Sequence, residues 1–247
     1  MTAPSYLSYV VLVSGAGIVA TLVFGLRLAL SRAGWSADDQ RRVVRMAALV
    51  LIGWLGIAFV LGVSGVYRGA SDQIPTIQYG ILVPILIGSM LIVRSSSMAR
   101  VIEAVPQQWL IGVQLYRALG IIFLILYGAG KMPGLFAWPA GIGDVLVGVL
   151  APVVAIAYAR APEKNRDLAW GWNILGLTDL TVAVATGMVT APSPIQQFAF
   201  DLPSELLGAF PLVLIPIYLV PLSVLLHLAS LTKLRRTAQH MELQHST

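Results

Sequence analysis

The chain has 247 residues, of which 57% are hydrophobic and 11% are charged, and its formal net charge is +5. A soluble domain typically carries about 25% charged residues, so this composition excludes an ordinary water-soluble enzyme. The sequence contains no cysteine, which excludes disulfides, thiolate metal sites and cysteine nucleophiles. We therefore expect a membrane protein that holds no metal and no cofactor.

Apolar segments of membrane length follow one another along the chain. A helix rises about 1.5 Å per residue, so roughly 20 apolar residues cross a hydrocarbon core of about 30 Å. The sequence predicts an all-α fold in which one transmembrane domain, residues 1–236, has seven helices. The predicted spans are about 7–30, 43–67, 74–93, 107–129, 138–160, 168–190 and 205–232. The polar residues 237–247 are expected to form a disordered tail.

Lys and Arg residues lie almost entirely on one side of these spans. With the N-terminus outside, the inner loops and the tail contain all of them except Arg68, Lys131 and Arg117. Cytoplasmic loops of membrane proteins carry an excess of Lys and Arg. We therefore predict an outside N-terminus, a cytoplasmic C-terminus and a location in a bacterial-type plasma membrane. The basic charge then reflects topology in the lipid bilayer and gives no support to binding of nucleic acid.

The first inner loop contains a helix-start signal. Ser36, with Asp39 three residues later, resembles a capping box. The pattern predicts that the second helix begins near Ala37.

The seventh predicted span contains prolines at unusual density. Each proline removes one helix hydrogen bond and clashes with the preceding turn, which membrane helices tolerate when neighbouring groups satisfy the freed carbonyls. Two interpretations are open, a helix that is merely kinked and a hinge for a moving helix. The candidate hinge residues are Pro211, Pro216 and Pro221.

The order of the spans suggests an internal repeat. Spans one to three and five to seven run in the same sense, and at one fixed offset Arg32 corresponds to Arg160 and Pro75 to Pro203. This 3+1+3 layout resembles that of SWEET-type sugar transporters, which join two parallel three-helix units by a fourth helix. Their Pro-Gln pair in the first helix of each unit is missing here, so the resemblance is topological. Rhodopsins share the seven-span arrangement, but the seventh span lacks the lysine that a retinal Schiff base needs.

Three consecutive spans carry one charge each in their interior. Arg117 and Asp179 fall near the middle of the fourth and sixth spans, and Asp144 lies about 8 Å outward of the centre of the fifth. An unpaired charge at the bilayer centre costs at least ~2.5–3.5 kcal/mol, so we expect these groups to meet one another or water. One cation against two carboxylates leaves one surplus carboxylate, which must be protonated, hold a cation or face water.

Several polar residues extend this predicted site. Gln114 lies one turn from Arg117, and Tyr116 is adjacent to it. Asn173 precedes Asp179 in the sixth span. The third span contributes Gln78, and His227 is expected near the inner interface as a snorkelling or capping residue. A structural interpretation, in which the charges only fix helix packing, competes with a functional one.

The stretch from Arg117 to Asp144 is similar to the first hairpin of DoxX-type small membrane proteins. In those proteins an Arg-led apolar helix ends in Gly-x-Lys, and a second helix carries an acid beside glycines. The matching residues here are Arg117, Gly120, Phe123, Gly130, Lys131 and Asp144. This resemblance implies an accessory role in a membrane redox complex.

Residues Gly141 to Asp144 match the Gly-x-Gly-Asp motif of intramembrane aspartyl proteases. The chemistry of that family requires two carboxylates that share a proton, and Asp179 is the candidate partner of Asp144. The motif precedes its partner here, whereas in the family it follows it, and the family's Pro-Ala-Leu element is not found.

The leading hypothesis from the sequence is a seven-helix protein that binds or transports a small polar solute, coupled to protons or cations. In it Arg117 binds an anionic group or sets the charge of Asp179, and Asp144 is the titrating carboxylate near the outer mouth. The alternatives are the intramembrane protease and a sensor or accessory subunit.

Overall fold

The computed structural model of the chain describes residue 4 and residues 6–245. Throughout this described part the secondary structure is helical, and no strand occurs in it. The elements in chain order are α1 (Tyr6–Arg32), α2 (Ala37–Ser64), α3 (Ile77–Arg94), α4 (Ser96–Ala104), α5 (Gln107–Gly112), η1 (Val113–Gly120), α6 (Ile121–Gly128), α7 (Gly134–Arg160), α8 (Arg166–Thr190), η2 (Glu205–Gly208), η3 (Ile215–Leu219) and α9 (Val220–His245).

Seven helical stretches are long and apolar enough to cross a membrane. Five of them are the helices α1, α2, α3, α7 and α8. The fourth span, Gln107–Gly128, is made of α5, η1 and α6, and the seventh, Ile215–Thr237, combines η3 with most of α9. The described residues therefore form a bundle of the kind that multi-pass membrane proteins have.

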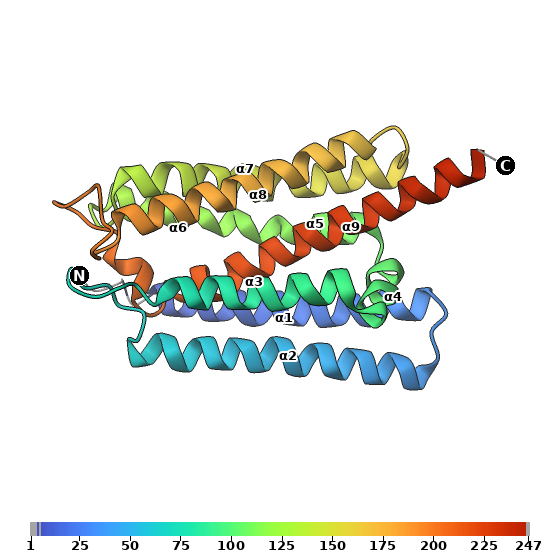
Figure 1. Cartoon of the computed structure of the whole chain (residues 1–247), viewed down its shortest axis with the longest axis horizontal. Coiled ribbons are helices and arrows are strands. Elements are labelled where there is room, and N and C mark those ends of the chain that lie inside the picture. The colour runs from blue at the N-terminus through green and yellow to red at the C-terminus, as the bar shows by residue number, and fades with distance from the viewer. Residues whose placement is uncertain (1–3, 5, 246–247) are drawn as a thin grey trace.

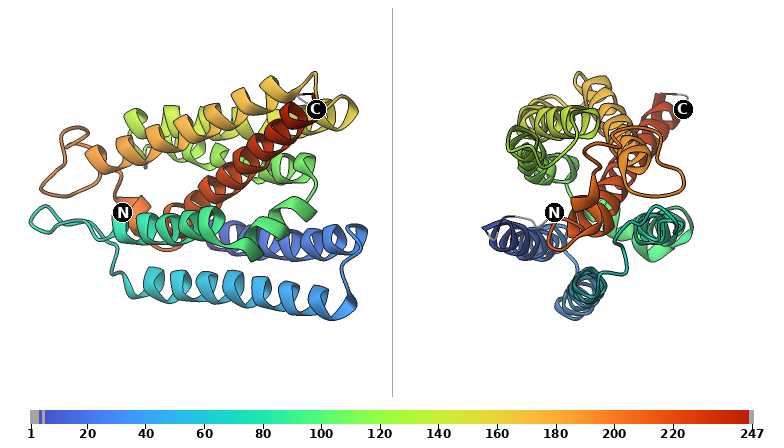
Figure 2. Two further views of the ribbon diagram at one scale, coloured as in Figure 1. Left: turned by 45° about the vertical axis from the view of Figure 1, so that its right-hand side comes forward. Right: turned by 90° about the vertical axis from the view of Figure 1, so that its left-hand side faces the viewer.

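The bundle has two groups of helices with α9 between them. The helices of the fourth span pack against α7, and α7 packs against α8. On the other side α1 pairs with α2, while α3 lies against α9. Figure 1 shows α9 crossing the bundle obliquely, and the two views of Figure 2 show it between the two groups. Its position brings one face of α9 against α5 and α8 at the centre of the molecule.

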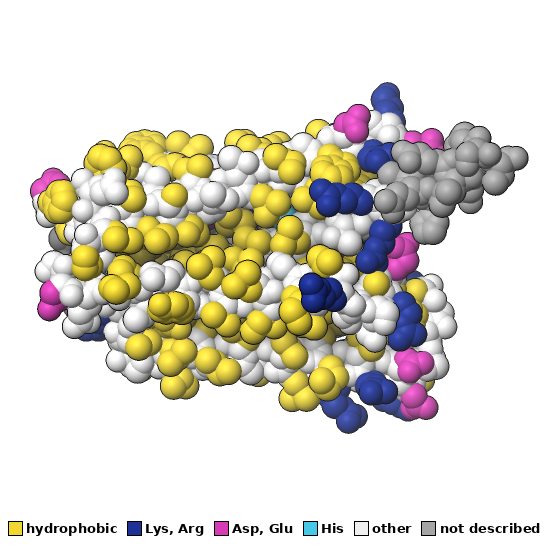
Figure 3. Space-filling model, in the orientation of Figure 1, with side chains coloured by type: hydrophobic (Ala, Val, Ile, Leu, Met, Phe, Trp, Pro, Cys, Tyr) yellow, Lys and Arg dark blue, Asp and Glu magenta, His cyan; other side chains and the backbone are white. Residues whose placement is uncertain are grey.

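The two ends of the bundle differ in charge. The described N-terminal residues lie at one end, called the N-terminal end below, and α9 leads to the other, the C-terminal end (Figure 1). Lys and Arg side chains gather near the C-terminal end of the visible face, while hydrophobic side chains cover the middle (Figure 3). This distribution matches the pattern of a protein whose apolar belt faces lipid.

The capping signal in the first inner loop is confirmed. Ser36 is the N-cap of α2, and its hydroxyl accepts a hydrogen bond from the backbone N–H of Asp39 at 3.1 Å. The hydroxyl of Ser36 also donates to Oδ2 of Asp39 at 2.7 Å. The helix begins at Ala37, as the sequence predicts.

The fourth span is wound more tightly in its middle than an α-helix. Residues 113–120 form a 3₁₀ helix, in which side chains three residues apart lie above one another. Its buried residues are Gln114, Arg117 and Gly120, which follow this three-residue period. The tight winding therefore turns all three toward the interior of the bundle.

The seventh span begins later than the sequence predicts. Residues 209–214 form turns in which Leu212, Val213 and Leu214 are buried, and a π-helical turn from Ile215 leads into α9. Pro211 thus lies before the span and Pro216 lies in the π-helical turn, while Pro221 is near the start of α9. Buried apolar turns have the hydropathy of a helix, which is why the predicted start at 205 is too early.

The C-terminal residues also differ from expectation. The sequence predicts a disordered tail over 237–247, whereas α9 continues to His245, and residues 246 and 247 lie outside the described part. Residues 237–245 contain no glycine or proline, and they include Ala, Gln, Met, Leu and Glu, which favour helix. The helix therefore extends beyond the apolar part of the span.

Close helix packing at Gly148 gives a test of this fold. A Cβ added at Gly148 of α7 would lie 2.4 Å from the backbone nitrogen of Ala118, an atom that cannot move away on its own. Gly148→Ala should lower stability by about 1–3 kcal/mol, as overpacking does. The measurement is the thermal unfolding midpoint of the purified protein in detergent. The matched control is Gly171→Ala in α8, where an added Cβ meets nothing within 4 Å, and equal midpoints for the two variants would contradict the packing of the fourth span on α7.

Candidate functional site

Arg117 lies at the centre of a buried charged cluster. Its Nε donates a hydrogen bond to Oδ1 of Asp144 at 2.8 Å, and Nη2 lies 2.8 Å from the same oxygen. Nη2 also donates to Oδ2 of Asp179. The guanidinium thus joins α7 and α8, which carry the two carboxylates, to the fourth span. We name these three side chains the charged triad.

The remaining nitrogen of the guanidinium is held by α8 and α9. Nη1 donates to the carbonyl oxygen of Gly176 at 3.3 Å and lies 3.1 Å from Nε2 of His227. A guanidinium has donors and no acceptor, so Nε2 of the histidine must be the acceptor. All three nitrogens of Arg117 therefore face acceptors supplied by the protein.

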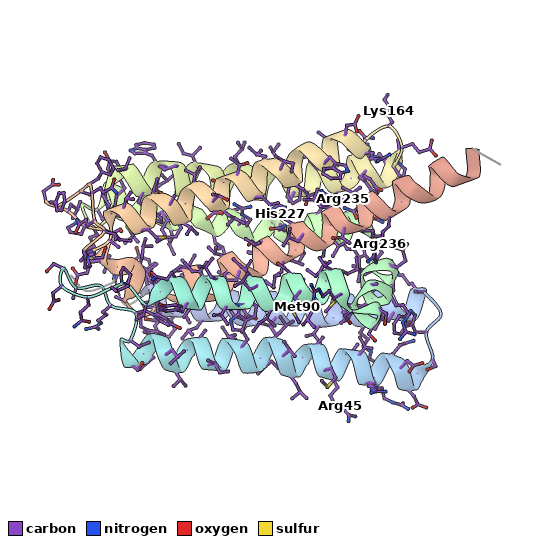
Figure 4. All side chains as sticks on the ribbon, viewed as in Figure 1. Arg45, Met90, Lys164, His227, Arg235 and Arg236 are labelled. Carbon is purple, nitrogen blue, oxygen red and sulfur yellow. The ribbon has the colours of Figure 1, made fainter. Side chains whose placement is uncertain are left out.

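This contact fixes the tautomer of His227. Because Nε2 accepts, the ring proton is on Nδ1, which donates to Oδ1 of Asn173 at 3.0 Å. The ring also packs against the indole of Trp172, with centroids 4.9 Å apart. His227 is therefore a neutral, oriented side chain in the middle of the bundle, as its place in Figure 4 illustrates.

A column of hydrogen bonds continues from His227 toward the C-terminal end. Nδ2 of Asn173 donates to the carbonyl oxygen of Ala169 at 2.7 Å and to Oγ of Ser230 at 2.9 Å. Gln107 donates to the same serine oxygen at 2.6 Å. Asn173, Ser230, His227 and Gln107 are all buried. This column, which we call the amide column, places hydrogen-bonded polar groups on that side of the triad, while Oε1 of Gln107 has no partner among the described residues.

The two carboxylates are not equivalent in their surroundings. The side chain of Asp179 is 8% exposed and that of Asp144 is 14% exposed, against 2% for Arg117. Within the described part of the chain, no hydrogen bond reaches Oδ2 of Asp144 or Oδ1 of Asp179. A Cβ built on Gly143 would lie 1.6 Å from Oδ1 of Asp179, so that oxygen packs against the α7 backbone. Oδ2 of Asp144 packs against the fourth span in the same way, since a Cβ built on Gly120 would lie 2.8 Å from it. By the exposure of its whole side chain, Asp144 is nevertheless the more accessible acid of the triad.

Two cavities meet this accessible carboxylate. A cavity of about 40 Å³ lies between α1, the fourth span, α7 and α9, and residues of the triad that line it are Arg117 and Asp144. A second cavity of about 70 Å³ is also lined by Asp144. It extends to Tyr67, which follows the end of α2, and to Gly208 of η2. A water molecule needs roughly 10–15 Å³ of such space, so each cavity has room for a few. Burial raises the pKa of Tyr67, which keeps its hydroxyl neutral at this end of the larger cavity.

The structure brings together most of the residues that the sequence singles out. Arg117, Asp144 and Asp179 form one cluster, and Asn173 joins it through His227. α7 begins at Gly134, four residues before the predicted start, so Asp144 lies nearer the middle of its span than expected.

Three predicted site residues lie outside the triad's own hydrogen bonds. The hydroxyl of Tyr116 shares a hydrogen bond of 2.7 Å with Ser223 of α9. Gln114 is completely buried, and neither its Oε1 nor its Nε2 has a partner among the described residues. Gln78 lies in the first turn of α3, apart from the triad, with its Oε1 buried and unpaired among those residues.

The sequence prediction misplaces His227 and omits its neighbours Ser223, Ser230 and Gln107. With the seventh span starting at Ile215, position 227 falls at mid-depth and the expected interfacial location is wrong. The signal was present, because residues 223, 227 and 230 follow the spacing that places side chains on one face of a helix. These three residues form the polar face of α9 that meets the fourth span and α8.

The fold and the site together define an all-helical bundle with seven candidate membrane spans and a buried charged triad. Residues 74–235 match the model of a family described as "Domain of unknown function (DUF8737)", and the chain belongs to this family. The matched region contains the triad, the amide column and every element from α3 to α8, whereas α1 and α2 lie outside it. No curated protein and no solved structure matches the chain.

The unpaired amide of Gln114 gives a test of this site. Burying a polar group without a partner costs about 1–3 kcal/mol, so Gln114→Leu should leave the thermal unfolding midpoint unchanged or raise it. Gln107→Leu is the matched control, because it removes a buried hydrogen bond to Ser230 and should lower the midpoint. A large loss in Gln114→Leu would instead show that its amide is satisfied in the folded protein, for example by internal water.

Proposed function

We propose that this protein binds or transports a small polar solute across a lipid bilayer, and that Asp144 takes up the coupled proton or cation. The observation that carries the proposal is that two buried carboxylates share one guanidinium. If both carboxylates were ionised, the triad would carry a net negative charge in an apolar interior, which is unfavourable without a partner. A proton or a cation on the more accessible carboxylate removes that charge.

The asymmetry around the triad supports access from one side. Both cavities contact Asp144, and the larger one reaches the loops at the N-terminal end. Toward the C-terminal end the interior is occupied by the buried side chains of the amide column. This arrangement is what a site open to one face and closed to the other requires.

The contacts of Arg117 change the role that the sequence suggests for it. Binding an anionic solute would require a free donor, and each guanidinium nitrogen already faces a carboxylate, a carbonyl or an imidazole. We propose that Arg117 holds the charge and position of Asp179 and leaves Asp144 as the exchangeable group.

The protease alternative receives no support from this geometry. An aspartyl protease places a catalytic water between two carboxylates that share a proton. Here Nη2 of Arg117 lies between Asp144 and Asp179 and contacts both.

The finer architectural predictions belong to this proposal. We propose an outside N-terminus and a cytoplasmic C-terminus in the plasma membrane, supported by the gathering of Lys and Arg at the C-terminal end (Figure 3). The 3+1+3 repeat receives less support from the packing. The third helix of the first candidate unit, α3, lies against α9 of the second unit, whereas α7 of the second unit packs on the fourth span and on α8. The hinge function is proposed for Pro216 and Pro221, which lie where the seventh span begins.

The orientation can be tested with single cysteines, because the chain has none of its own. Ser71→Cys and Glu163→Cys place exposed thiols in loops at opposite ends of the bundle. In intact cells a membrane-impermeant maleimide should label Ser71→Cys, and it should label Glu163→Cys only after permeabilisation. The reverse pattern would overturn the proposed orientation.

The role of Asp144 predicts a titrating carboxyl inside the bundle. Infrared difference spectra of the reconstituted protein, recorded as the pH is changed, should contain the C=O band of a buried carboxylic acid. Asp144→Asn should remove this band and also abolish proton movement into liposomes under an imposed membrane potential. Asn keeps the oxygen that accepts from Arg117, so the fold should persist, which an unchanged thermal midpoint would verify.

The matched control for this experiment is Asp72→Asn, which changes an exposed carboxylate in a loop at the N-terminal end. It should retain both the band and the proton movement. If Asp144→Asn behaves as the control does in both measurements, Asp144 is not the coupling group and the proposal fails.

A further inference from the structure

We propose that the solute is a small organic ammonium ion with a short apolar body, which pairs with Asp144 and fills the two cavities beside it. This inference rests on the proposed function and names the chemical class of its solute. It follows from the charge, the walls and the size of the space around Asp144.

The two cavities share one carboxylate, that of Asp144. Residues that line both are Phe123, Asp144, Leu180, Ile215 and Val220. Among these shared walls Asp144 is the charged residue, and the other four are apolar. Arg117 also lines the smaller cavity and Glu205 lines the larger one near η2, so Asp144 is the acid that a solute in either cavity would meet.

The charge of the triad favours a cation in this space. The donors of Arg117 are directed at protein acceptors, whereas Oδ2 of Asp144 receives no hydrogen bond from the described residues. An ammonium group supplies N–H donors, and hydrogen bonds between ionised partners are roughly twice as strong as neutral ones. An anion would meet the surplus negative charge without a free donor.

The apolar walls distinguish an organic cation from a metal ion. The larger cavity is lined by side chains such as Ile81, Phe136, Val184 and Met188. Ions such as Ca²⁺ take six to eight oxygen ligands, and the described residues contain no group of three or more acidic or His side chains that could hold a metal. Hydrocarbon on the solute would instead bury apolar surface against these walls.

The volumes limit the size of the solute. The cavities measure about 40 and 70 Å³, and an apolar cavity of about 150 Å³ accepts benzene. A solute that fills both spaces is therefore of about five non-hydrogen atoms by the same comparison. A branched four-carbon primary amine has this size.

A proton and an ammonium ion would compete for the same oxygen. When Asp144 holds a proton, the carboxyl is neutral and loses its attraction for a cation. When the proton leaves, the carboxylate can bind the ammonium group. Solute binding and protonation are thus mutually exclusive at this group, which is the property that exchange of one for the other requires.

The test is calorimetric titration of the full chain in detergent with isobutylamine at a pH where the amine is protonated. Isobutanol and isobutyrate serve as uncharged and anionic probes of similar shape. Isobutylammonium should bind and the other two should not. Asp144→Asn should weaken its binding by more than about tenfold, since it removes the charged partner of a buried pair, while Asp72→Asn should bind as the wild type does.

A second pair of variants tests the apolar half of the inference. Ala183 of α8 lines the larger cavity, whereas Ala185 lies two residues further on an exposed face. Ala183→Leu should fill the cavity and weaken binding of isobutylammonium, and Ala185→Leu should not. Both variants keep the charged triad, so the infrared band of Asp144 should persist in each.

The outcomes separate this inference from the proposed function. If isobutanol or isobutyrate binds as tightly as the ammonium, or Na⁺ or K⁺ competes at equal concentration, the assigned solute class is wrong. If no probe binds while Asp144→Asn still abolishes the infrared band and proton movement, the inference falls and the proposed function stands. If the ammonium binds through Asp144 but the wild type has no titrating band, the solute class stands and the proton-coupled form of the proposed function fails.

Discussion

The bundle depends on one guanidinium that three helices must approach at the same depth. Arg117 holds α7 and α8 through their carboxylates and contacts α9 through His227. Removing one partner of a buried ion pair leaves an uncompensated charge, which costs far more than an exposed pair contributes. The packing of the fourth span, α7, α8 and α9 is therefore constrained by the requirement that these groups stay together. The elements outside this set, α1, α2 and α3, form the other group of helices (Figure 2) and contribute no side chain to the triad.

The surroundings of the triad divide the bundle into a polar, filled half and an apolar, hollow half. On one side the amides of Asn173 and Gln107 donate to the hydroxyl of Ser230, while the amide of Gln114 has no partner among the described residues. On the other side apolar walls enclose space next to Asp144. The carboxylate common to both cavities is that of Asp144. The nitrogens of Arg117, the most conspicuous residue of the sequence, face the two acids, a carbonyl oxygen and an imidazole.

The helical class, the candidate spans and the meeting of the three charges follow from the sequence because each rests on a strong rule. Apolar runs of membrane length form helices, and charges inside them seek partners. The start of the seventh span did not follow, since Leu212 to Leu214 are as apolar in a buried turn as in a helix. Because the predicted span starts at 205 and not at Ile215, the sequence places His227 near the interface and not at mid-depth. The 3₁₀ winding around Arg117 is likewise invisible to hydropathy, which records composition and not backbone geometry, and so is the close approach of α7 to the fourth span at Gly148.

The same close approach changes what scanning mutagenesis would reveal about this chain. A Cβ at Gly143 would overlap Asp179, and one at Gly176 would lie 2.2 Å from Nε2 of His227. Alanine at these positions adds an atom where the polar side chains need room, whereas alanine elsewhere removes atoms. An alanine scan that ranks residues by lost function would therefore rank Gly143 and Gly176 as high as the charged residues. The residues found to be important would then include the glycines that pack around the triad as well as the triad itself.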